Sequence, residues 1–208
     1  MHEIWSAFLK GLLETSFWEA IAVIAGIASV WYSRSENILV YPVGLINTII
    51  YIFLSLQVHL YGEASVNLYY TVMSIYGWIL WGKRDDQKHH ITTIQFSNRK
   101  ELIQQIAFFL FFYISIYFVL SYLKKSFSPG AIPFADALAS ASAFTGMWLM
   151  ARKKVESWYW WIITNICSIP LYFIKGFVFT SVYYLILLIL AFAGLMEWYK
   201  KARLNVAQ

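Results

Sequence analysis

Aromatic and amide side chains stand at helical spacing in the segment WYWWIITN, which covers residues 158 to 165. Trp158, Trp161 and Asn165 are separated by three and then four positions, so a helix would place all three on one face. Two indoles and an amide suit a flat cationic ring, because indoles attract it through stacking and cation–π contacts while the amide fixes its orientation. Trp158 also lies near the end of its apolar run, where an interfacial aromatic belt is the alternative explanation.

Further amides and hydroxyls interrupt the apolar segments of the chain. The candidates for chemistry are Asn47, Tyr51, Asn67, Tyr70 and Ser74, whereas Trp78 falls near a span end, where an interfacial belt is the default explanation. In hydrocarbon an unpaired amide costs several kcal/mol, so each must find a partner or face a wet cavity. The alternative role is to join helices through hydrogen bonds, each of which contributes under about 1 kcal/mol.

The elements that must position these side chains are long apolar runs. The 208 residues are 60% hydrophobic and 13% charged, whereas soluble domains are nearer half apolar and a quarter charged. Runs of about 20 apolar residues match the thickness of a bilayer core. The sequence therefore predicts an all-α integral membrane protein with seven transmembrane helices, at residues 17–32, 38–57, 62–82, 103–122, 132–150, 158–175 and 178–199.

Two parts of the chain resemble each other. Gly77 and Trp81 in SIYGWILWGK correspond to Gly194 and Trp198 in AFAGLMEWYK, and Asn47 corresponds to Asn165 after a gap of one residue. We therefore expect a 3+1+3 arrangement of two parallel triple-helix repeats, which in transporters places the substrate between the halves. The expected units are an interfacial amphipathic helix at 1–16, repeats at 17–82 and 131–199, a cytoplasmic loop and linker helix at 83–130, and a cytoplasmic tail at 200–208.

The basic residues indicate orientation. Sixteen Lys and Arg against eleven Asp and Glu give a formal net charge of +5. They lie in short loops beside apolar runs and not along one exposed face, so nucleic-acid binding is not expected. With seven spans, twelve of the sixteen fall on one side and four on the other. The positive-inside rule then places the N-terminus outside and the C-terminus in the cytoplasm.

Enzymatic chemistry finds little support. The four His residues lie at span ends or in loops, Cys167 is a single cysteine in an apolar run, and the sequence has no HExxH or P-loop motif. We expect no enzyme, no metal site and no cofactor. The carboxylates Glu63 and Asp136, near the starts of two spans, do not form a proton relay, which favours passive transport.

The sequence resembles a known family at three places. The WxxWxxxN motif at 158–165, LYGEASVNLYYTVMSIYGWILW at 60–81 and YPVGLINTIIY at 41–51 are similar to segments of the PnuC family of bacterial vitamin transporters. The resemblance covers about residues 18 to 199. It implies a seven-helix fold similar to SWEET sugar transporters, located in the bacterial cytoplasmic membrane. It also implies facilitated diffusion of nicotinamide riboside, which a cytoplasmic kinase traps by phosphorylation.

The resemblance also implies a set of binding residues. Trp158, Trp161 and Asn165 should contact the substrate. Asn67 stands where family members often have Gln, which keeps the amide but shortens it by a methylene. Tyr70, Ser74 and Trp78 follow Asn67 at steps of three or four and would line the same cavity.

The residue types agree with this substrate. Nicotinamide riboside has a cationic pyridinium, a carboxamide and a ribose, and calls for aromatic rings, amides and hydroxyls. A phosphate would call for Arg or Lys, which the spans almost lack, so we expect the mononucleotide to be rejected. Thiamine or riboflavin transport on the same scaffold remains an alternative, as does a non-transporting structural protein whose polar residues only pack helices. Association of several copies is left open.

Overall fold

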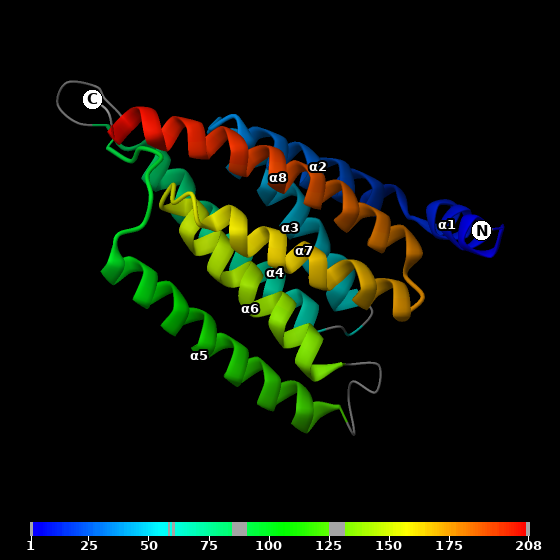
Figure 1. Ribbon diagram of the computed structural model, residues 1–208. Coiled ribbons are helices and arrows are strands. Elements are labelled where there is room, and N and C mark those ends of the chain that lie inside the picture. Colours follow the sequence, from blue (N-terminus) through cyan, green and yellow to red (C-terminus); the bar gives the residue numbers. More distant parts are fainter. Residues whose placement is uncertain (1, 58, 60, 85–90, 125–131, 207–208) are drawn as a thin grey trace.

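The computed structural model describes residues 2–57, 59, 61–84, 91–124 and 132–206 and shows an all-helical chain over them (Figure 1). An isolated parallel bridge between Gln95 and Lys154 is the one extended contact found between described segments. The helices are α1 (His2–Glu14), α2 (Phe17–Arg34), α3 (Val40–Gln57), α4 (Tyr61–Gly82), α5 (Arg99–Leu123), α6 (Pro133–Ala151), α7 (Ser157–Ile174) and α8 (Val178–Val206).

Local signals explain where several helices begin. The Ser16 hydroxyl accepts a bond from the Glu19 amide and caps α2. Asn98 and Glu101 form a capping box that starts α5 at Arg99, ahead of the apolar run predicted from residue 103. At the other end of the chain, α8 continues to Val206, so most of the segment expected as a tail is helical.

Length and composition support membrane insertion for part of the bundle. Among the described residues, α3, α5 and α8 are long and apolar enough to cross a bilayer, and the bent pair of α1 and α2 makes a fourth candidate. The two helices of that pair meet at 112°. By the same criteria α4, α6 and α7 do not qualify, and α4 and α7 carry most of the polar candidates. The prediction of seven crossings is thus supported only in its coarser form, an all-helical membrane protein.

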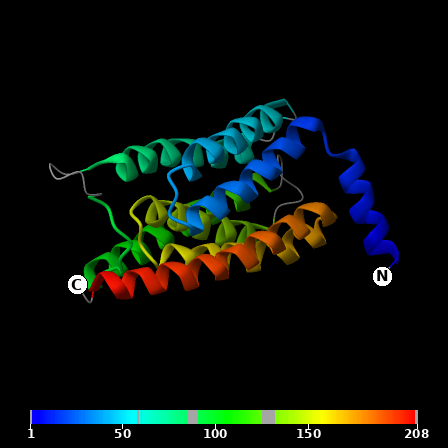
Figure 2. The ribbon, with the colours of Figure 1, turned by 90° about the horizontal axis from the view of Figure 1, so that it is seen from above.

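The helices pack in two groups. α2, α3 and α4 contact one another in succession, as do α6, α7 and α8. Contacts of α2 with α8 and of α4 with α6 join the groups. α5 lies along the outside of α6, which is its main neighbour (Figure 1). It also contacts α7, where the Trp160 indole donates to the Gln105 amide oxygen at 2.8 Å. α1 turns away from α2 and packs against α8 (Figure 2).

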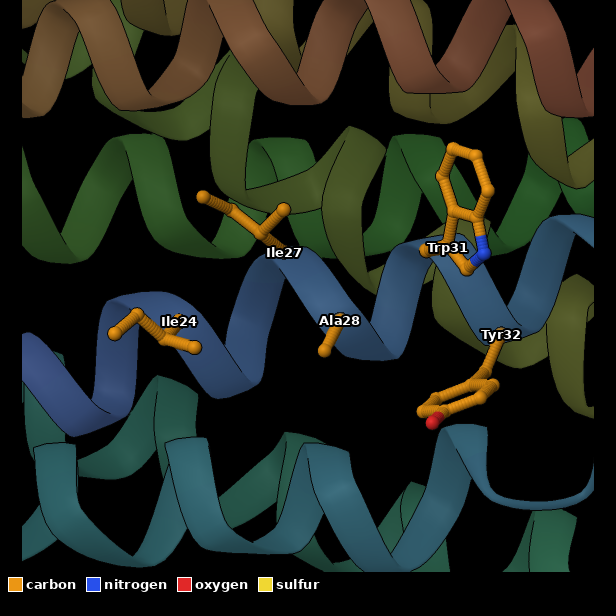
Figure 3. Close-up of a pocket in the computed structure, with 5 residues that line it drawn as sticks. All are labelled: Ile24, Ile27, Ala28, Trp31 and Tyr32. Carbon is orange, nitrogen blue, oxygen red and sulfur yellow. The ribbon is translucent and has the colours of Figure 1, made fainter.

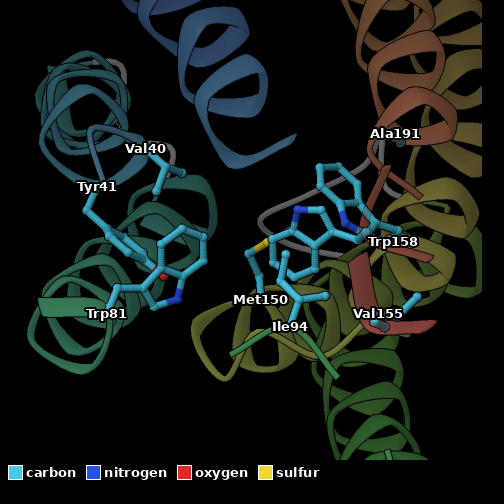
Figure 4. Packing of buried hydrophobic residues seen from close by; sticks show 10 residues of the cluster. Val40, Tyr41, Trp81, Ile94, Met150, Val155, Trp158 and Ala191 are labelled. Atoms are coloured by element: carbon cyan, nitrogen blue, oxygen red, sulfur yellow. The ribbon is translucent and has the colours of Figure 1, made fainter. Parts of the chain in front are cut away.

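The largest buried side chains gather at one end of the bundle, in a cluster that we call the aromatic core: Tyr41, Trp81, Trp158 and Trp198 (Figure 4). Tyr41 meets Trp81 edge to face at 5.1 Å, and Trp158 meets Trp198 in the same way at 5.5 Å. Trp81 and Trp198 are 6.0 Å apart between ring centroids. Ile94, Met150 and Val155 fill the space around them.

The two halves make equivalent contacts here. A Cβ added to Gly77 would overlap the ring of Tyr41, and one added to Gly194 would overlap the ring of Trp158. Each glycine thus lets an aromatic ring from a neighbouring helix lie against the backbone. The residues matched in the sequence repeat therefore occupy matched places in the packing.

Each of two tryptophans also binds the end of a helix in the other group. The indole Nε1 of Trp81, on α4, donates to the carbonyl of Ala151 at the end of α6, at 3.0 Å. The Nε1 of Trp198, on α8, donates to the carbonyls of Ser33 and Arg34 at the end of α2, at 3.1 and 3.2 Å. These donors satisfy carbonyls that a helix end leaves without an intrahelical partner.

The turns that follow α2 and α6 are joined by an ion pair. Glu36 and Lys153 both adopt left-handed backbone, with φ of 60° and 52°. Lys153 Nζ lies 2.8 Å from Glu36 Oε1 and 4.6 Å from the centroid of the Trp81 ring, and its side chain is only 4% exposed. Lys201 contacts the other carboxylate oxygen at 3.3 Å. This end of the bundle is therefore closed by rings, hydrogen bonds and paired charges together.

Candidate substrate site

One face of α4 carries a continuous row of polar side chains. Glu63, Asn67, Tyr70 and Ser74 follow at steps of four, three and four, which keeps them on one side of the helix. Asn67 and Ser74 are buried, and the Asn67 amide donates to the Glu63 carbonyl at 3.0 Å. Trp78 continues the spacing but is 42% exposed. The α4 row is the first wall of the candidate site.

Aromatic rings from three helices form the second wall. The ring centroids of Tyr70 on α4 and Trp161 on α7 are 6.3 Å apart, and Phe144 of α6 lies 6.2 Å from Tyr70. A Cβ on Gly146 of α6 would come within 3.3 Å of the Trp161 indole. The missing side chain at Gly146 therefore allows Trp161 to lie close to α6. The structure thus brings together Tyr70 and Trp161, which the sequence predicted for one site.

Asn165 stands one turn beyond Trp161 on α7. Its side chain is 3% exposed, and within the described part of the chain it makes no hydrogen bond. Its amide atoms are not among the described polar atoms that are fully buried without a partner, so they keep some access to the space around them. Thr164, its neighbour, uses its hydroxyl on the backbone carbonyls of Ala139 and Trp160. An amide held in this state is ready to bind a ligand that brings its own polar groups.

Tyrosines from α3, α4, α7 and α8 form a group that we call the tyrosine cluster: Tyr51, Tyr70, Tyr172, Tyr183 and Tyr184. The Tyr172 and Tyr184 rings stack at 5.1 Å, and Tyr183 lies 5.6 Å from Tyr184. Each of these side chains keeps intermediate solvent exposure. We call the partly accessible lining that the five tyrosines form the recess. The recess offers several hydroxyls to a ligand.

Two predicted residues have evident packing roles. The Asn47 amide donates to the carbonyl of Ala22 on α2 at 2.7 Å, so it joins helices. Trp158 is 1% exposed in the aromatic core, and its Nε1 lacks a hydrogen-bond partner among the described residues. By spacing Trp158 shares the face of Trp161 and Asn165, but it lies at the closed end. Whether either residue contacts substrate stays a prediction.

Four further residues lie near the site although the sequence does not assign them to it. Glu63 forms no proton relay, and its position four residues before Asn67 is the signal that places it on the same helix face. Tyr172, Tyr183 and Tyr184 add hydroxyls to their apolar runs, but aromatic residues are abundant in all spans, so the sequence does not place these three at the site. Only the packing of α7 against α8 shows that these three rings meet.

The charges near the recess are few. Lys175, just after α7, pairs with Asp136 of α6 at 2.6 Å. Glu63 interacts electrostatically with both of them, but no ion pair of Glu63 occurs in the part of the chain that the structure describes. Over the same residues no group of His, Cys, Asp and Glu could hold a metal ion. The recess is therefore polar and aromatic, with no free cation among its described neighbours.

A separate depression of about 420 Å³ lies on α2 and is lined by Ile24, Ile27, Ala28, Trp31 and Tyr32 (Figure 3). All five side chains come from one helix and none is charged or an amide. Vitamin sites need convergent polar groups that fix the ligand's orientation. This apolar surface suits acyl chains and is no candidate for the substrate site.

Comparison with known proteins agrees with the fold and the motifs. The family described as "Nicotinamide mononucleotide transporter" matches residues 16–200. The nicotinamide riboside transporter PnuC of Escherichia coli is 26% identical over 93% of this chain and 89% of its own length. The riboflavin/roseoflavin transporter RibM of Streptomyces davaonensis is 22% identical over 97% of this chain and 88% of its own.

A solved structure shows the same fold. The crystal structure of the vitamin B3 transporter PnuC superposes with a TM-score of 0.70 at 20% identity, covering 96% of this chain and 88% of the other. The family match extends over nearly the whole chain, including every segment that forms the candidate site. The chain therefore belongs to the nicotinamide mononucleotide transporter family, the PnuC family of membrane transporters.

Proposed function

We propose that this protein carries nicotinamide riboside across the bacterial cytoplasmic membrane by facilitated diffusion. The observation that carries the proposal is the buried, unbonded amide of Asn165 beside the rings of Trp161 and Tyr70. The pyridinium would stack on these rings, since cation–π attraction in a desolvated site contributes about 2 kcal/mol. Its carboxamide would bond to Asn165. Relatives of similar length are named as transporters of this riboside.

The remaining predicted residues have assigned places in this proposal. Asn67, Ser74 and the tyrosine hydroxyls would bind the ribose. Trp158 would form the floor under Trp161, while Asn47 and Tyr51 hold the wall formed by α3 and Trp78 flanks the α4 row. No cofactor is needed for this process.

A mononucleotide fits the site less well than the riboside. Its phosphate would need Arg or Lys, and the nearest lysine among the described residues, Lys175, is already paired with Asp136. Lys153 is paired with Glu36 at the other end of the bundle. Burying a phosphate without a cation would cost far more than the site's hydrogen bonds could return. We therefore propose that the mononucleotide is excluded.

The two helix groups would supply alternating access. We propose seven crossings, with α2–α4 and α6–α8 as the two repeats, α5 as the linker, and the aromatic core on the cytoplasmic side. In this form the core is closed and the tyrosine cluster is accessible. The halves would rock about the site with Pro42 and Pro170 as flexible points, since proline interrupts the helical hydrogen bonds. A cytoplasmic kinase would then trap the riboside, and copies of the chain would be free to associate.

Riboflavin is the second candidate substrate, because a relative aligned over 97% of this chain is named as a riboflavin transporter. Its isoalloxazine would stack on the same rings. Thiamine, whose thiazolium is also a flat cation, is the third. A purely structural role would leave every one of these vitamins unbound.

The experiment is binding to the purified protein in detergent, followed by quenching of tryptophan fluorescence with the riboside, its mononucleotide, riboflavin and thiamine in turn. We expect the riboside alone to quench, and Trp161→Ala to weaken binding at least about tenfold. Trp31→Ala, at a position 52% exposed on α2, is the matched control and should bind as the wild type does. Quenching by riboflavin or thiamine alone would reassign the substrate, and no quenching by any of them would support the structural role.

A further inference from the structure

The α4 row ends in a carboxylate that the proposed binding mode does not yet use. Glu63 lies one turn before Asn67 and on the same face as Tyr70 and Ser74. The site that follows it on this face contains amides, hydroxyls and rings, all of them neutral. The row thus combines one negative charge with an otherwise uncharged site.

The surroundings of Glu63 are those of the recess. The carboxylate interacts electrostatically with the tyrosines of the cluster, Tyr51, Tyr70, Tyr172 and Tyr184. The side chain is solvent-exposed and hydrogen-bonds to Asn67 of the same row. Its place on the α4 face that carries Tyr70, together with these interactions, directs the carboxylate toward the recess. Its charge is then directed at whatever binds there.

The nearby charges leave Glu63 available. Lys175 is the cation closest to it in electrostatic effect, and Lys175 Nζ lies 2.6 Å from Asp136. Three other carboxylates of the described bundle have cationic partners: Glu36 with Lys153, Glu101 with Lys154 and Glu197 with Arg34. A carboxylate in a recess attracts a cation more strongly than one in open water, because low-dielectric walls focus its field.

We propose that Glu63 is the counter-charge that makes the site prefer a cationic ring to a neutral ring of the same shape. The inference rests on the proposed function, since the pyridinium of nicotinamide riboside is that cation. The buried amide of Asn165 orients the ring from α7 while Glu63 supplies the charge from α4. The site would then discriminate against a neutral vitamin such as riboflavin by charge as well as by size.

The competing explanation is that Glu63 only stabilises the start of α4. It stands in the first turn of that helix, where a negative side chain interacts favourably with the helix dipole. This role would affect folding and would act equally on all ligands. Two ligands that share the carboxamide and the ribose but differ in charge therefore separate the two explanations, when the effect of one Glu63 variant is compared on both.

The test is calorimetric titration of the purified protein with nicotinamide riboside and with its reduced dihydropyridine form, which keeps the carboxamide and ribose but carries no charge. We expect the wild type to prefer the cation. Glu63→Gln should raise the Kd of the cationic form about tenfold and change that of the reduced form less than about twofold. Glu63→Asp, which restores the charge, should recover most of the preference.

Glu19→Gln is the matched control, because Glu19 also stands in the first turn of a helix and within electrostatic reach of Tyr51. It lies outside the α4 row and should leave the preference unchanged. An equal loss of both ligands in Glu63→Gln, or no change for either, would overturn the inference while leaving the proposed function intact. A wild type that binds neither form would overturn the proposed function, and the inference with it.

Discussion

The two ends of the bundle treat their polar groups in opposite ways. At the aromatic core, the indoles of Trp81 and Trp198 donate to carbonyls of the opposite helix group, and Glu36 pairs with the nearly buried Lys153. In the tyrosine cluster the side chains stay partly accessible, and Asn165 between the two ends makes no hydrogen bond within the described residues. At one end the polar groups bind each other and hold the helices together. At the other end they remain available to a ligand.

Under the proposed rocking of the two helix groups, this difference identifies the contacts that would have to break. These contacts all lie at the aromatic core. They are the ion pair between the turns that follow α2 and α6, and the indole hydrogen bonds from α4 and α8 to the ends of α6 and α2. Even there two polar atoms, Tyr41 Oη and Trp158 Nε1, are buried without a partner among the described residues. They occupy equivalent places in the two helix groups, so the closed end bears the same cost twice. Opening would let water bind both atoms, and this would lower the free-energy cost of opening.

The largest effect is expected where a ring lies on a glycine of the closed end. Gly194→Ala would drive a methyl group into the buried Trp158 ring, and overpacking of this kind costs about 2–3 kcal/mol. Gly62→Ala is the matched control on a helix of the open end, because an added Cβ there meets nothing within 4 Å. The midpoint of thermal unfolding in detergent should fall markedly for Gly194→Ala. It should stay within experimental error of the wild-type value for Gly62→Ala. Equal midpoints would show that the aromatic core repacks freely.

The ion pair of the closed end should come next. Glu36→Gln removes the carboxylate from the nearly buried Lys153, whose side chain is 4% exposed. Uncompensated buried charges cost about 3–5 kcal/mol, but Glu36 itself is 26% exposed, so we expect about 2 kcal/mol. Lys201→Gln, which removes the more exposed partner at 3.3 Å, should cost under about 0.5 kcal/mol. Chemical unfolding compares the free energies of unfolding of the two variants. Equal losses of stability would mean that the contact of Glu36 with Lys201 matters as much as its contact with Lys153.

A smaller loss is expected from the indole hydrogen bonds. Trp81→Phe and Trp198→Phe each keep a ring but remove the donor to a helix-end carbonyl. The lost bond costs about 1 kcal/mol, and the smaller ring adds a cavity cost because both tryptophans are buried. Because the rings lie in one cluster, the stability loss of the double variant should differ from the sum of the two single losses. Labelling of a cysteine introduced near the core would rise in these variants if the bonds hold that end closed. Unchanged labelling would assign the bonds to folding alone.

Sequence reasoning reached the helices and part of the site for definite physical reasons. Apolar runs located the helices because bilayer thickness fixes their length, but the capping box at Asn98 lies in polar sequence and moved the start of α5. The spacing that places Trp161 and Asn165 on one face is a property of a single helix and can be read from the sequence. The pairing of helices cannot, so the contact of Trp161 with Tyr70 and the burial of Trp158 are known only from the structure. Asn47 and Asn165 matched in sequence but differ in partners.

The difference between Asn47 and Asn165 leads to the prediction with the smallest expected change in stability. It distinguishes a packing role from a binding role. Asn47 donates to the Ala22 carbonyl at 2.7 Å, so Asn47→Leu should cost about 1 kcal/mol of stability by removing this hydrogen bond between α3 and α2. Asn165→Leu removes a buried amide that has no described partner, and should be neutral or stabilising by up to about 1 kcal/mol. The same variant should abolish binding of the riboside, so stability and affinity would change in opposite directions at one residue. If Asn165→Leu instead destabilised the protein as Asn47→Leu does, Asn165 would be a packing residue, and the site would have to lie elsewhere in the recess.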